Sequence, residues 1–218
     1  MLRVIDGLID SSHVNKIDDI LNVLPYRRQY KDRFARTWSS QQNPDVASKI
    51  LEIIGKDKFV QIRKIIHNMG LPEDGENLLS IKNFTVIKLS GIDLPLAWHR
   101  DSYVDESGKF VGIEPFTFKM ALSIKDSGGM STVFAPFYDS KRIVNSEWKA
   151  FFVSLNPKVV RIQSRLSPGD AQIFRTDVMH KRPVCFWGNR ENIIFTFLFS
   201  DCHKRHSIDN HLSAYSSI

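Results

Sequence analysis

The chain has 218 residues, 42% of them hydrophobic and 25% charged, and its 30 Lys and Arg outnumber its 24 Asp and Glu. This composition is typical of a globular domain and excludes a wholly disordered chain. Two cysteines exclude a disulfide scaffold, and no apolar run approaches the ~20 residues of a membrane span. The cysteine content and the lack of a secretory leader pattern at the start predict a cytoplasmic protein.

The first third of the chain, residues 1–79, reads as a helical region packed on the rest. Ser11-Ser12 can cap a first helix, in which apolar residues recur at steps of three and four. Asn43-Pro44 provides the cap and first turn of a second helix. Gly55 separates it from a third helix, which the Gly-Leu-Pro sequence at 70–72 ends.

From residue 80 the pattern changes to short strands separated by turn residues. Phe116 to Ile124 alternates between apolar and other residues, which is typical of a strand with one buried face. A mainly β domain with N-terminal helices, a β-sandwich or jelly roll, is therefore expected over 80–200, followed by a polar tail at 201–218. The other predicted strands cover 81–89, 159–163, 171–174 after the turn Pro168-Gly169-Asp170, and 193–199.

One triplet, His99-Arg100-Asp101, has the spacing of a metal site. Residues two apart on a strand point to the same side, so His99 and Asp101 can ligate one ion. A second histidine would complete a 2-His-1-carboxylate set, which leaves positions open on Fe(II). Taken alone, the triplet also fits an exposed or capping pair. A kinase catalytic loop does not fit, because Asp-Phe-Gly and a glycine-rich loop are missing and Glu106 stands where Asn is required.

A second histidine, His180, follows the predicted strand 171–174, and Arg190 precedes the apolar run 193–199. With these elements the sequence resembles the Fe(II)/2-oxoglutarate-dependent dioxygenases, particularly their phytanoyl-CoA dioxygenase-like branch. The resemblance covers about residues 80–200. It is carried by Trp98-His99-x-Asp101, the stretch 126–141, Pro168-Gly169-Asp170, His180 and Arg190.

The resemblance implies a double-stranded β-helix with His99, Asp101 and His180 as Fe(II) ligands. It also implies that Arg190 pairs with the distal carboxylate of 2-oxoglutarate, for which a planar guanidinium offers two parallel hydrogen bonds. The implied reaction consumes O2, converts 2-oxoglutarate to succinate and CO2, and oxidises an organic substrate. Family members that halogenate carry a small residue in place of the acidic ligand, so the presence of Asp101 favours a hydroxylase.

Three further residues are candidates for co-substrate binding. Asn192 shares a strand face with Arg190 by spacing and could assist it. Lys88 and Lys119 are alternative partners for the carboxylate, because some branches of the family use a lysine from a central strand. Each lysine is also compatible with an outward-facing, solvated position, which is the commoner environment of lysine.

The segment around the triplet offers substrate-lining candidates. Trp98 and Tyr103 flank the predicted metal ligands, and the long loop 102–115 that follows could act as a lid. Simple packing is the alternative for both aromatic residues. The tail residues Cys202, His203, His206 and His211 match no standard zinc spacing and read as solvated.

Residues 26–38 hold five cations and one acid, and their aromatic residues recur every four positions. One interpretation is an anion-binding lip with aromatic stacking. The other is a helix or an extended arm whose aromatic side chains pack on the barrel while its charges are solvated. We favour the second interpretation.

The sequence therefore predicts a single domain, 1–218, that hydroxylates a small organic metabolite or natural-product intermediate, with no membrane partner. The positive charge allows an anionic substrate. One alternative is an oxygenase that acts on a macromolecule, which only the basic segment 26–38 supports, and we do not expect a nucleic-acid partner. The other is a non-catalytic, cupin-like protein that binds a metal or a small molecule.

Overall fold

The structure is a computed structural model that describes residues 2–29, 32–69, 79–90, 102–104, 110–112, 118–125, 132–135, 162–176, 178–181 and 189–199. The predicted ligands His99 and Asp101 and the neighbouring Trp98 lie outside these ranges, as do the tail 201–218 and most of the loop 102–115. The predictions made for these residues are therefore not addressed by the described part of the chain.

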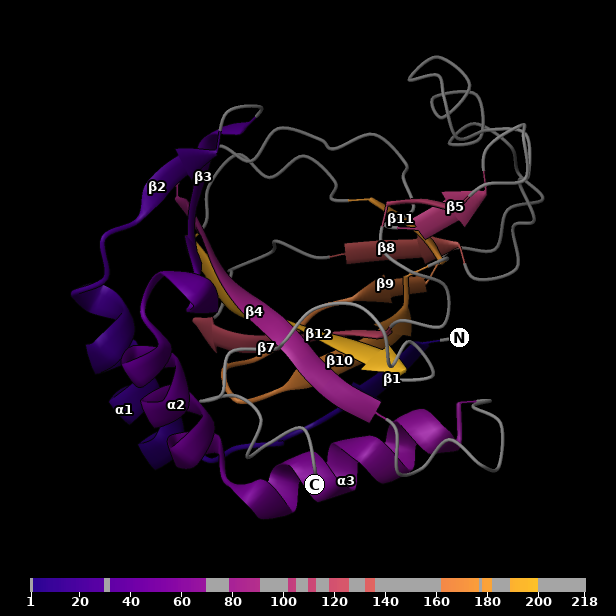
Figure 1. The fold of residues 1–218 in the computed structure, drawn as a ribbon, viewed down its shortest axis with the longest axis horizontal. Coiled ribbons are helices and arrows are strands. Elements are labelled where there is room, and N and C mark those ends of the chain that lie inside the picture. Colours follow the sequence, from indigo (N-terminus) through magenta and orange to yellow (C-terminus); the bar gives the residue numbers. More distant parts are fainter. Residues whose placement is uncertain are drawn as a thin grey trace.

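A seven-stranded antiparallel sheet forms the centre of the molecule (Figure 1). Its central strand, β12, pairs with β7 on one side and β4 on the other. In spatial order the strands are β1 (Leu2–Ile5), β10 (Ala171–Arg175), β7 (Phe118–Lys125), β12 (Asn189–Phe199), β4 (Leu79–Ser90), β3 (Asp32–Ser39) and β2 (Arg27–Gln29).

Two smaller sheets accompany the large one. The first has the order β11 (Met179–Lys181), β8 (Thr132–Ala135) and β9 (Ile162–Ser164), and the second pairs β5 (Ser102–Val104) with β6 (Phe110–Gly112). The three-stranded sheet lies on the side of the large sheet away from the helices (Figure 1). The predicted β-rich region after residue 80 is thus confirmed, and its described pairs are all antiparallel.

The described helices are α1 (Ser11–Asn22), α2 (Pro44–Ile54) and α3 (Lys56–His67), with a short 3-10 helix at Ser40–Gln42. The predicted cap Asn43 is confirmed, since its Oδ1 accepts a hydrogen bond from the backbone N–H of Val46 at 3.2 Å. Gly55 separates α2 from α3 with a positive φ of 91°. None of the helices in the described ranges is long and apolar enough to cross a membrane.

The cap of α1 differs from the prediction. Asp10 precedes the helix, and its Oδ1 accepts hydrogen bonds from the backbone N–H of His13 at 3.0 Å and from the Ser12 hydroxyl at 2.7 Å. The backbone hydrogen bond from His13 holds the pKa of Asp10 well below its usual value. A carboxylate at the positive end of a helix dipole is therefore the cap, in place of the serine pair.

The first third of the chain also contains three strands that the helical prediction missed. Strands β2 and β3 form a hairpin that extends the large sheet beyond β4, and β1 extends it beyond β10. The two faces of β3 explain the register: Trp38 packs in the helix-side core, whereas Ala35 packs with Leu89 on the other face. A spacing of four residues, read as helical, also keeps side chains on one face of a strand.

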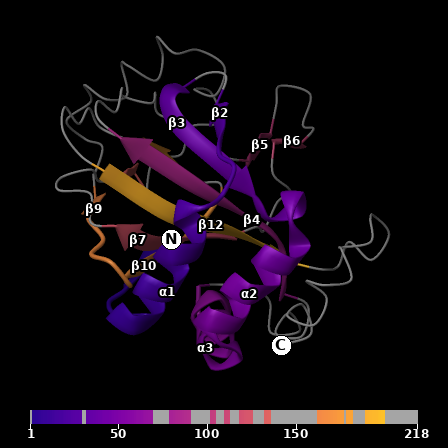
Figure 2. The ribbon, with the colours of Figure 1, turned by 90° about the vertical axis from the view of Figure 1, so that its left-hand side faces the viewer.

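The helices cover one face of the large sheet, where the main hydrophobic core lies (Figure 2). Phe59 of α3 packs edge-on against Phe195 of β12 at 5.8 Å, and Phe195 contacts Phe84 of β4 at 5.1 Å between ring centroids. The prediction that alternate residues of β7 share a buried face is confirmed from residue 118 onward. The sheet residues of this core include Trp38, Phe84, Val86, Phe118, Met120, Leu122, Ile124, Ile173, Ile193, Phe195 and Phe197.

The predicted turn before β10 joins three separate segments. The backbone N–H of Gly169 donates to the carbonyl of Ser123 at 2.9 Å, and its carbonyl accepts from Ile9 at 3.2 Å. Asp170 completes the junction, because its side chain accepts from the backbone N–H of Gly7 at 2.8 Å. Gly169 has a φ of +90°, and a Cβ there would lie against the carbonyl oxygen of Ile9.

We expect Gly169→Ala to lower the free energy of unfolding by about 3 kcal/mol or more, because it combines backbone strain with a clash against fixed backbone. Gly7→Ala is the matched control, since Gly7 also has a positive φ but a Cβ there meets nothing within 4 Å. It should cost about 1–2 kcal/mol. Urea denaturation of both variants measures the difference, and equal losses would contradict the clash.

Candidate active site

The face of the large sheet that points away from the helices carries polar side chains. On β12, Ile193 and Phe195 join the helix-side core, so Asn192 and Thr196 point the other way. Cross-strand pairing continues this face onto β7 and β10. Its buried polar residues are Ser123, Gln172, Asn192 and Thr196, none of them more than 9% exposed.

The sheet β11-β8-β9 contacts this polar face. Thr132 and Phe134 point to the same side of β8, and Phe134 packs on Phe174 of β10 at 5.1 Å between ring centroids. The pairing of strands places His180 beside Phe134 and Ser164 beside Thr132. We call the space between the two sheets the interior site. It is lined by Thr132, Phe134, Ser164, Gln172, Phe174, His180, Arg190 and Asn192.

The predicted ligand His180 is buried in the interior site, with 7% of its surface exposed. Its ring contacts Phe174 at 5.1 Å and Phe134 at 5.9 Å between centroids. Nδ1 lies 2.9 Å from the backbone carbonyl of Val178, which can only accept a hydrogen bond. Nδ1 is therefore the protonated nitrogen of the neutral ring, and Nε2 carries the lone pair with which a histidine ligates a metal ion.

The predicted clamp Arg190 projects into the same site from the start of β12. Its Nη2 donates to the hydroxyl of Thr132 at 3.1 Å. With the amide of Asn192 turned so that its oxygen faces the guanidinium donors, that oxygen accepts from Nε and Nη2 of Arg190 at 3.0 Å each. The Asn192 nitrogen then donates to the backbone carbonyl of Glu191 at 3.0 Å. In this orientation the Asn192 side chain contacts Arg190, and its predicted role beside a co-substrate stays a prediction.

Strand β8 connects the two predicted residues. Thr132 holds Arg190, and Phe134, two residues along, packs on His180. The arrangement therefore brings a buried imidazole and a partly buried guanidinium to the same strand. The two residues are ten positions apart in the sequence but belong to different sheets. Both side chains therefore lie between the large sheet and the sheet β11-β8-β9.

Two buried polar atoms of the interior site have no hydrogen-bond partner in the part of the chain that the structure describes. Gln172 Oε1 and Ser164 Oγ make no hydrogen bond to any residue in the described ranges, although their residues are only 2% and 6% exposed. A buried polar group without a partner costs free energy, so such groups normally meet water or a ligand. These atoms are consistent with an interior that binds a polar ligand.

The two lysine candidates lie on opposite faces of the large sheet. Lys119 pairs in register with Phe174 and Thr196, which places it on the face of the interior site. Lys88 points to the helix side, where its Nζ lies 3.5 Å from Glu191. The geometry therefore argues against Lys88 as a co-substrate ligand, because its ammonium is separated from Arg190 by the sheet.

The other predicted site residues are addressed in part. Within the described ranges, no three His, Cys, Asp or Glu side chains come close enough to hold a metal ion. His180 is the described member of the predicted ligand set, and the strand β5 that begins directly after Asp101 carries Tyr103. Trp98, His99 and Asp101 remain predictions.

In the basic-aromatic segment 26–38, the described residues after Tyr26 belong to the paired strands β2 and β3. Trp38 is 1% exposed in the core, and Tyr26 is half-buried with its hydroxyl donating to Glu191 at 2.8 Å. Arg27 and Arg36 are exposed. These described residues agree with the interpretation of packed aromatic side chains and solvated charges.

Sequence reasoning missed four residues that shape or support the interior site, namely Thr132, Ser164, Gln172 and Glu191. The available signal was weak: Gln172 interrupts an apolar run, and Glu191 stands two residues before the apolar run that begins at Ile193. Which of these side chains face one another depends on pairing between strands far apart in sequence, which no local pattern contains.

No family model matches the chain, and no curated protein matches its sequence. Solved structures share its fold. HygX from Streptomyces hygroscopicus with nickel, 2-oxoglutarate and hygromycin B bound matches with a TM-score of 0.62 at 13% identity, over 90% of this chain and 82% of that one. The non-heme alpha ketoglutarate dependent carbocyclase SnoK from nogalamycin biosynthesis gives 0.62 at 10% identity, over 90% and 78%. EctD from S. alaskensis with bound Fe gives 0.63 at 13% identity, over 90% and 72%.

Thr132→Val removes the hydroxyl that accepts from Arg190 while it keeps the shape of the side chain. We expect the free energy of unfolding to fall by about 1 kcal/mol or more, because a buried charged donor loses a hydrogen bond. Thr132→Ser retains the hydroxyl and is the matched control. Urea denaturation checks both, and a Thr132→Val protein as stable as the Ser variant would contradict the assigned hydrogen bond.

Proposed function

We propose that the chain is an Fe(II)- and 2-oxoglutarate-dependent oxygenase that hydroxylates a small organic metabolite. The observation that carries the proposal is that the partly buried Arg190 and the buried His180 both contact side chains of β8, Thr132 and Phe134 respectively. The fold shared with HygX, crystallised with nickel, 2-oxoglutarate and hygromycin B, and with EctD, crystallised with bound Fe, supports it.

His180 fits the proposed metal, because its neutral ring presents the Nε2 lone pair and imidazole is a preferred ligand of Fe(II). His99 and Asp101 would supply the other two ligands. Bound there, iron supplies the oxidative step in which 2-oxoglutarate and O2 yield succinate, CO2 and the oxidised substrate. The aromatic rings of Phe134 and Phe174 pack against His180 and keep water from that side of it.

Arg190 would bind the distal carboxylate of 2-oxoglutarate. Thr132 and Asn192 fix its guanidinium through Nε and Nη2, so the cation is oriented before the co-substrate arrives. A charged donor inside a largely buried site pairs strongly with a carboxylate. Lys119, on the same sheet face, is a further candidate for this pairing.

Within the superfamily, we assign the chain to the phytanoyl-CoA dioxygenase-like branch on the strength of Trp98-His99-x-Asp101 and the elements that follow it. The two facing sheets would then be the halves of a double-stranded β-helix over residues 80–200, with 1–79 packed outside it. The acidic ligand Asp101 supports hydroxylation over halogenation. The small-molecule substrate is supported by fold neighbours such as the one bound to hygromycin B.

His180→Ala should abolish stoichiometric Fe(II) binding, because it removes one of three proposed ligands. His67→Ala is the control, since His67 ends helix α3 outside the interior site. Metal content after anaerobic reconstitution measures the effect. Iron stoichiometry that survives His180→Ala would refute the assignment, whatever the activity.

Arg190→Met should weaken 2-oxoglutarate binding about tenfold or more, because the loss of a charge-assisted pair leaves the distal carboxylate unpartnered. Binding of 2-oxopentanoate, which has no distal carboxylate, should not change. Calorimetry on Ni(II)-loaded protein compares the two acids. If both weaken equally, Arg190 does not bind the distal carboxylate.

Succinate formation tests catalysis itself. The Fe(II)-loaded protein should release succinate from 2-oxoglutarate in air and none without O2, and a panel of small metabolites should raise the rate when it contains a substrate. Metal and 2-oxoglutarate binding without any succinate would favour the non-catalytic, cupin-like alternative.

A further inference from the structure

Glu191 is a buried carboxylate on the reverse side of the strand that carries the proposed clamp. It is 1% exposed and points to the helix side of β12, whereas its neighbours Arg190 and Asn192 point into the interior site. The neighbouring residues on its own face, Ile193 and Phe195 included, are apolar core residues. A charge at this position therefore needs an explanation.

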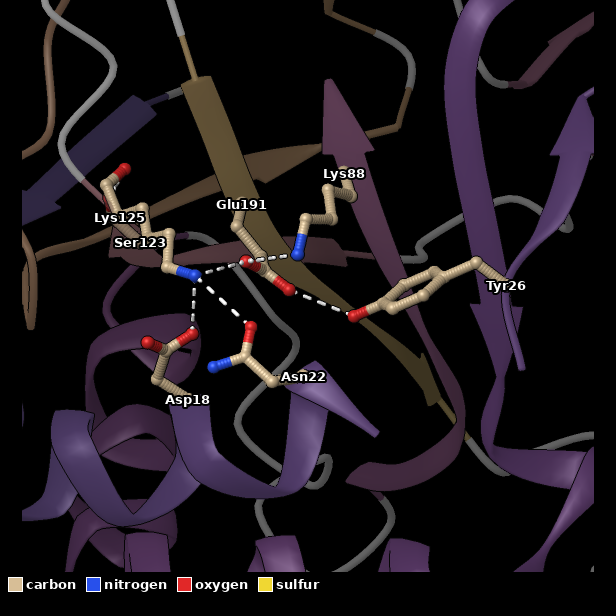
Figure 3. A network of polar contacts seen from close by, with 7 residues as sticks. All are labelled: Asp18, Asn22, Tyr26, Lys88, Ser123, Lys125 and Glu191. Atoms are coloured by element: carbon tan, nitrogen blue, oxygen red, sulfur yellow. Dashed lines mark hydrogen bonds and ion pairs between the residues drawn. The ribbon is translucent and has the colours of Figure 1, made fainter. Parts of the chain in front are cut away.

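A ring of polar side chains surrounds Glu191 (Figure 3). Its Oε1 accepts from the Tyr26 hydroxyl at 2.8 Å, and its Oε2 lies 3.3 Å from Nζ of Lys125 and 3.5 Å from Nζ of Lys88. Lys125 also pairs with Asp18 of α1 at 2.7 Å. The carboxylate thus links β12 to β4, β7, helix α1 and the segment before β2.

A β-bulge brings Lys125 to this side of the sheet. Leu122 and Ile124 belong to the helix-side core, so strict alternation would aim Lys125 at the interior site. The register between β12 and β7 shifts at this point, with Glu191 opposite Lys125 and Asn192 opposite Ser123. Ile124 is the extra residue, and the shift re-aims Lys125 toward Glu191.

Net stability is a poor explanation for such a network. Replacement of a buried ion-pair set by apolar residues is often neutral or stabilising, because desolvation offsets the attraction between the charges. What a set of directional contacts does specify is one conformation of the backbone that carries it. Here that backbone is the start of β12, where the Glu191 carbonyl also accepts from the Asn192 amide that holds Arg190.

We propose that Glu191 is a positioning residue for Arg190. Held by Tyr26, Lys88 and Lys125 on the helix side, it fixes the start of β12 so that Arg190 and Asn192 face the interior site before the co-substrate binds. This inference rests on the proposed function, since it assigns to the clamp of 2-oxoglutarate a support outside the site.

The test compares two 2-oxo acids on Ni(II)-loaded protein by calorimetry. Glu191→Leu should raise the Kd of 2-oxoglutarate about fivefold or more, because a misplaced Arg190 loses its match to the distal carboxylate. It should leave the Kd of 2-oxopentanoate within about twofold. In an Arg190→Met background, Glu191→Leu should have no further effect, since the residue acts through the arginine.

Two variants serve as controls. Tyr26→Phe removes one hydrogen bond from Glu191 and keeps the ring, so it should shift the Kd of 2-oxoglutarate in the same direction by about twofold. If Glu191→Leu does not fold, the Kd of 2-oxoglutarate for Tyr26→Phe decides whether Glu191 has the positioning role. Phe59→Leu weakens the helix-side core away from the network and should lower the Tm without changing either Kd.

The outcomes separate this inference from the function on which it rests. The positioning role is overturned if Glu191→Leu weakens the binding of both acids equally. It is also overturned if Phe59→Leu, at an equal loss of Tm, raises the Kd of 2-oxoglutarate. If Arg190→Met weakens 2-oxoglutarate binding but Glu191→Leu and Tyr26→Phe do not, the positioning role is overturned and the proposed function is not. A wild-type protein that binds no 2-oxoglutarate overturns the proposed function and this inference together.

Discussion

The alternation of side chains along β12 is the constraint on which the rest of the structure depends. One face of the strand supplies Ile193, Phe195 and Phe197 to the core under the helices, and the other supplies Asn192 and Thr196 to the interior site. Because successive side chains of a strand point to opposite faces of the sheet, a shift of the pairing register by one residue would exchange the two sets. The hydrophobic packing that stabilises the domain therefore also determines which polar groups meet at the site. The long pairing of β12 with both β4 and β7 makes that register hard to change.

Strand β12 also shows how far sequence reasoning reaches. Its apolar run predicted a buried strand, and the spacing placed Asn192 on the same strand face as Arg190, where the turned amide contacts the guanidinium. The strand begins four residues before that run, however, because the lysines and the tyrosine around Glu191 make a buried acid tolerable there. Such partners come from residues as distant as Tyr26 and cannot be found in a local pattern. The same reason hid Thr132 and Gln172, whose roles depend on which strands pair. Asp10 caps α1 in place of Ser11 and Ser12, because the capping residue is the one at which the backbone enters the helix.

The interior site combines features that favour a charged, polar co-substrate. Two neutral side chains, Thr132 and Asn192, hold its cation through hydrogen bonds. The acid closest in sequence, Glu191, is kept on the far side of the sheet by two lysines. The sheet thus separates opposite charges that the sequence places side by side. This separation keeps the Glu191 carboxylate away from the face of the sheet on which Arg190 contacts Thr132.

The edge of the large sheet at β2 affects how readily the protein aggregates in concentrated solution. Strand β2 is the last strand on that side, and its sequence is Arg-Arg-Gln, with Arg27 exposed. The unpaired backbone groups of an edge strand can form hydrogen bonds with a strand of a second molecule, which begins aggregation. Cations on an edge strand oppose this, because they repel the same cations on the second molecule. Since salt screens such repulsion over about 8 Å at physiological ionic strength, the protection weakens as salt is added. The arginines of β2 are thus expected to oppose edge-to-edge association between two molecules.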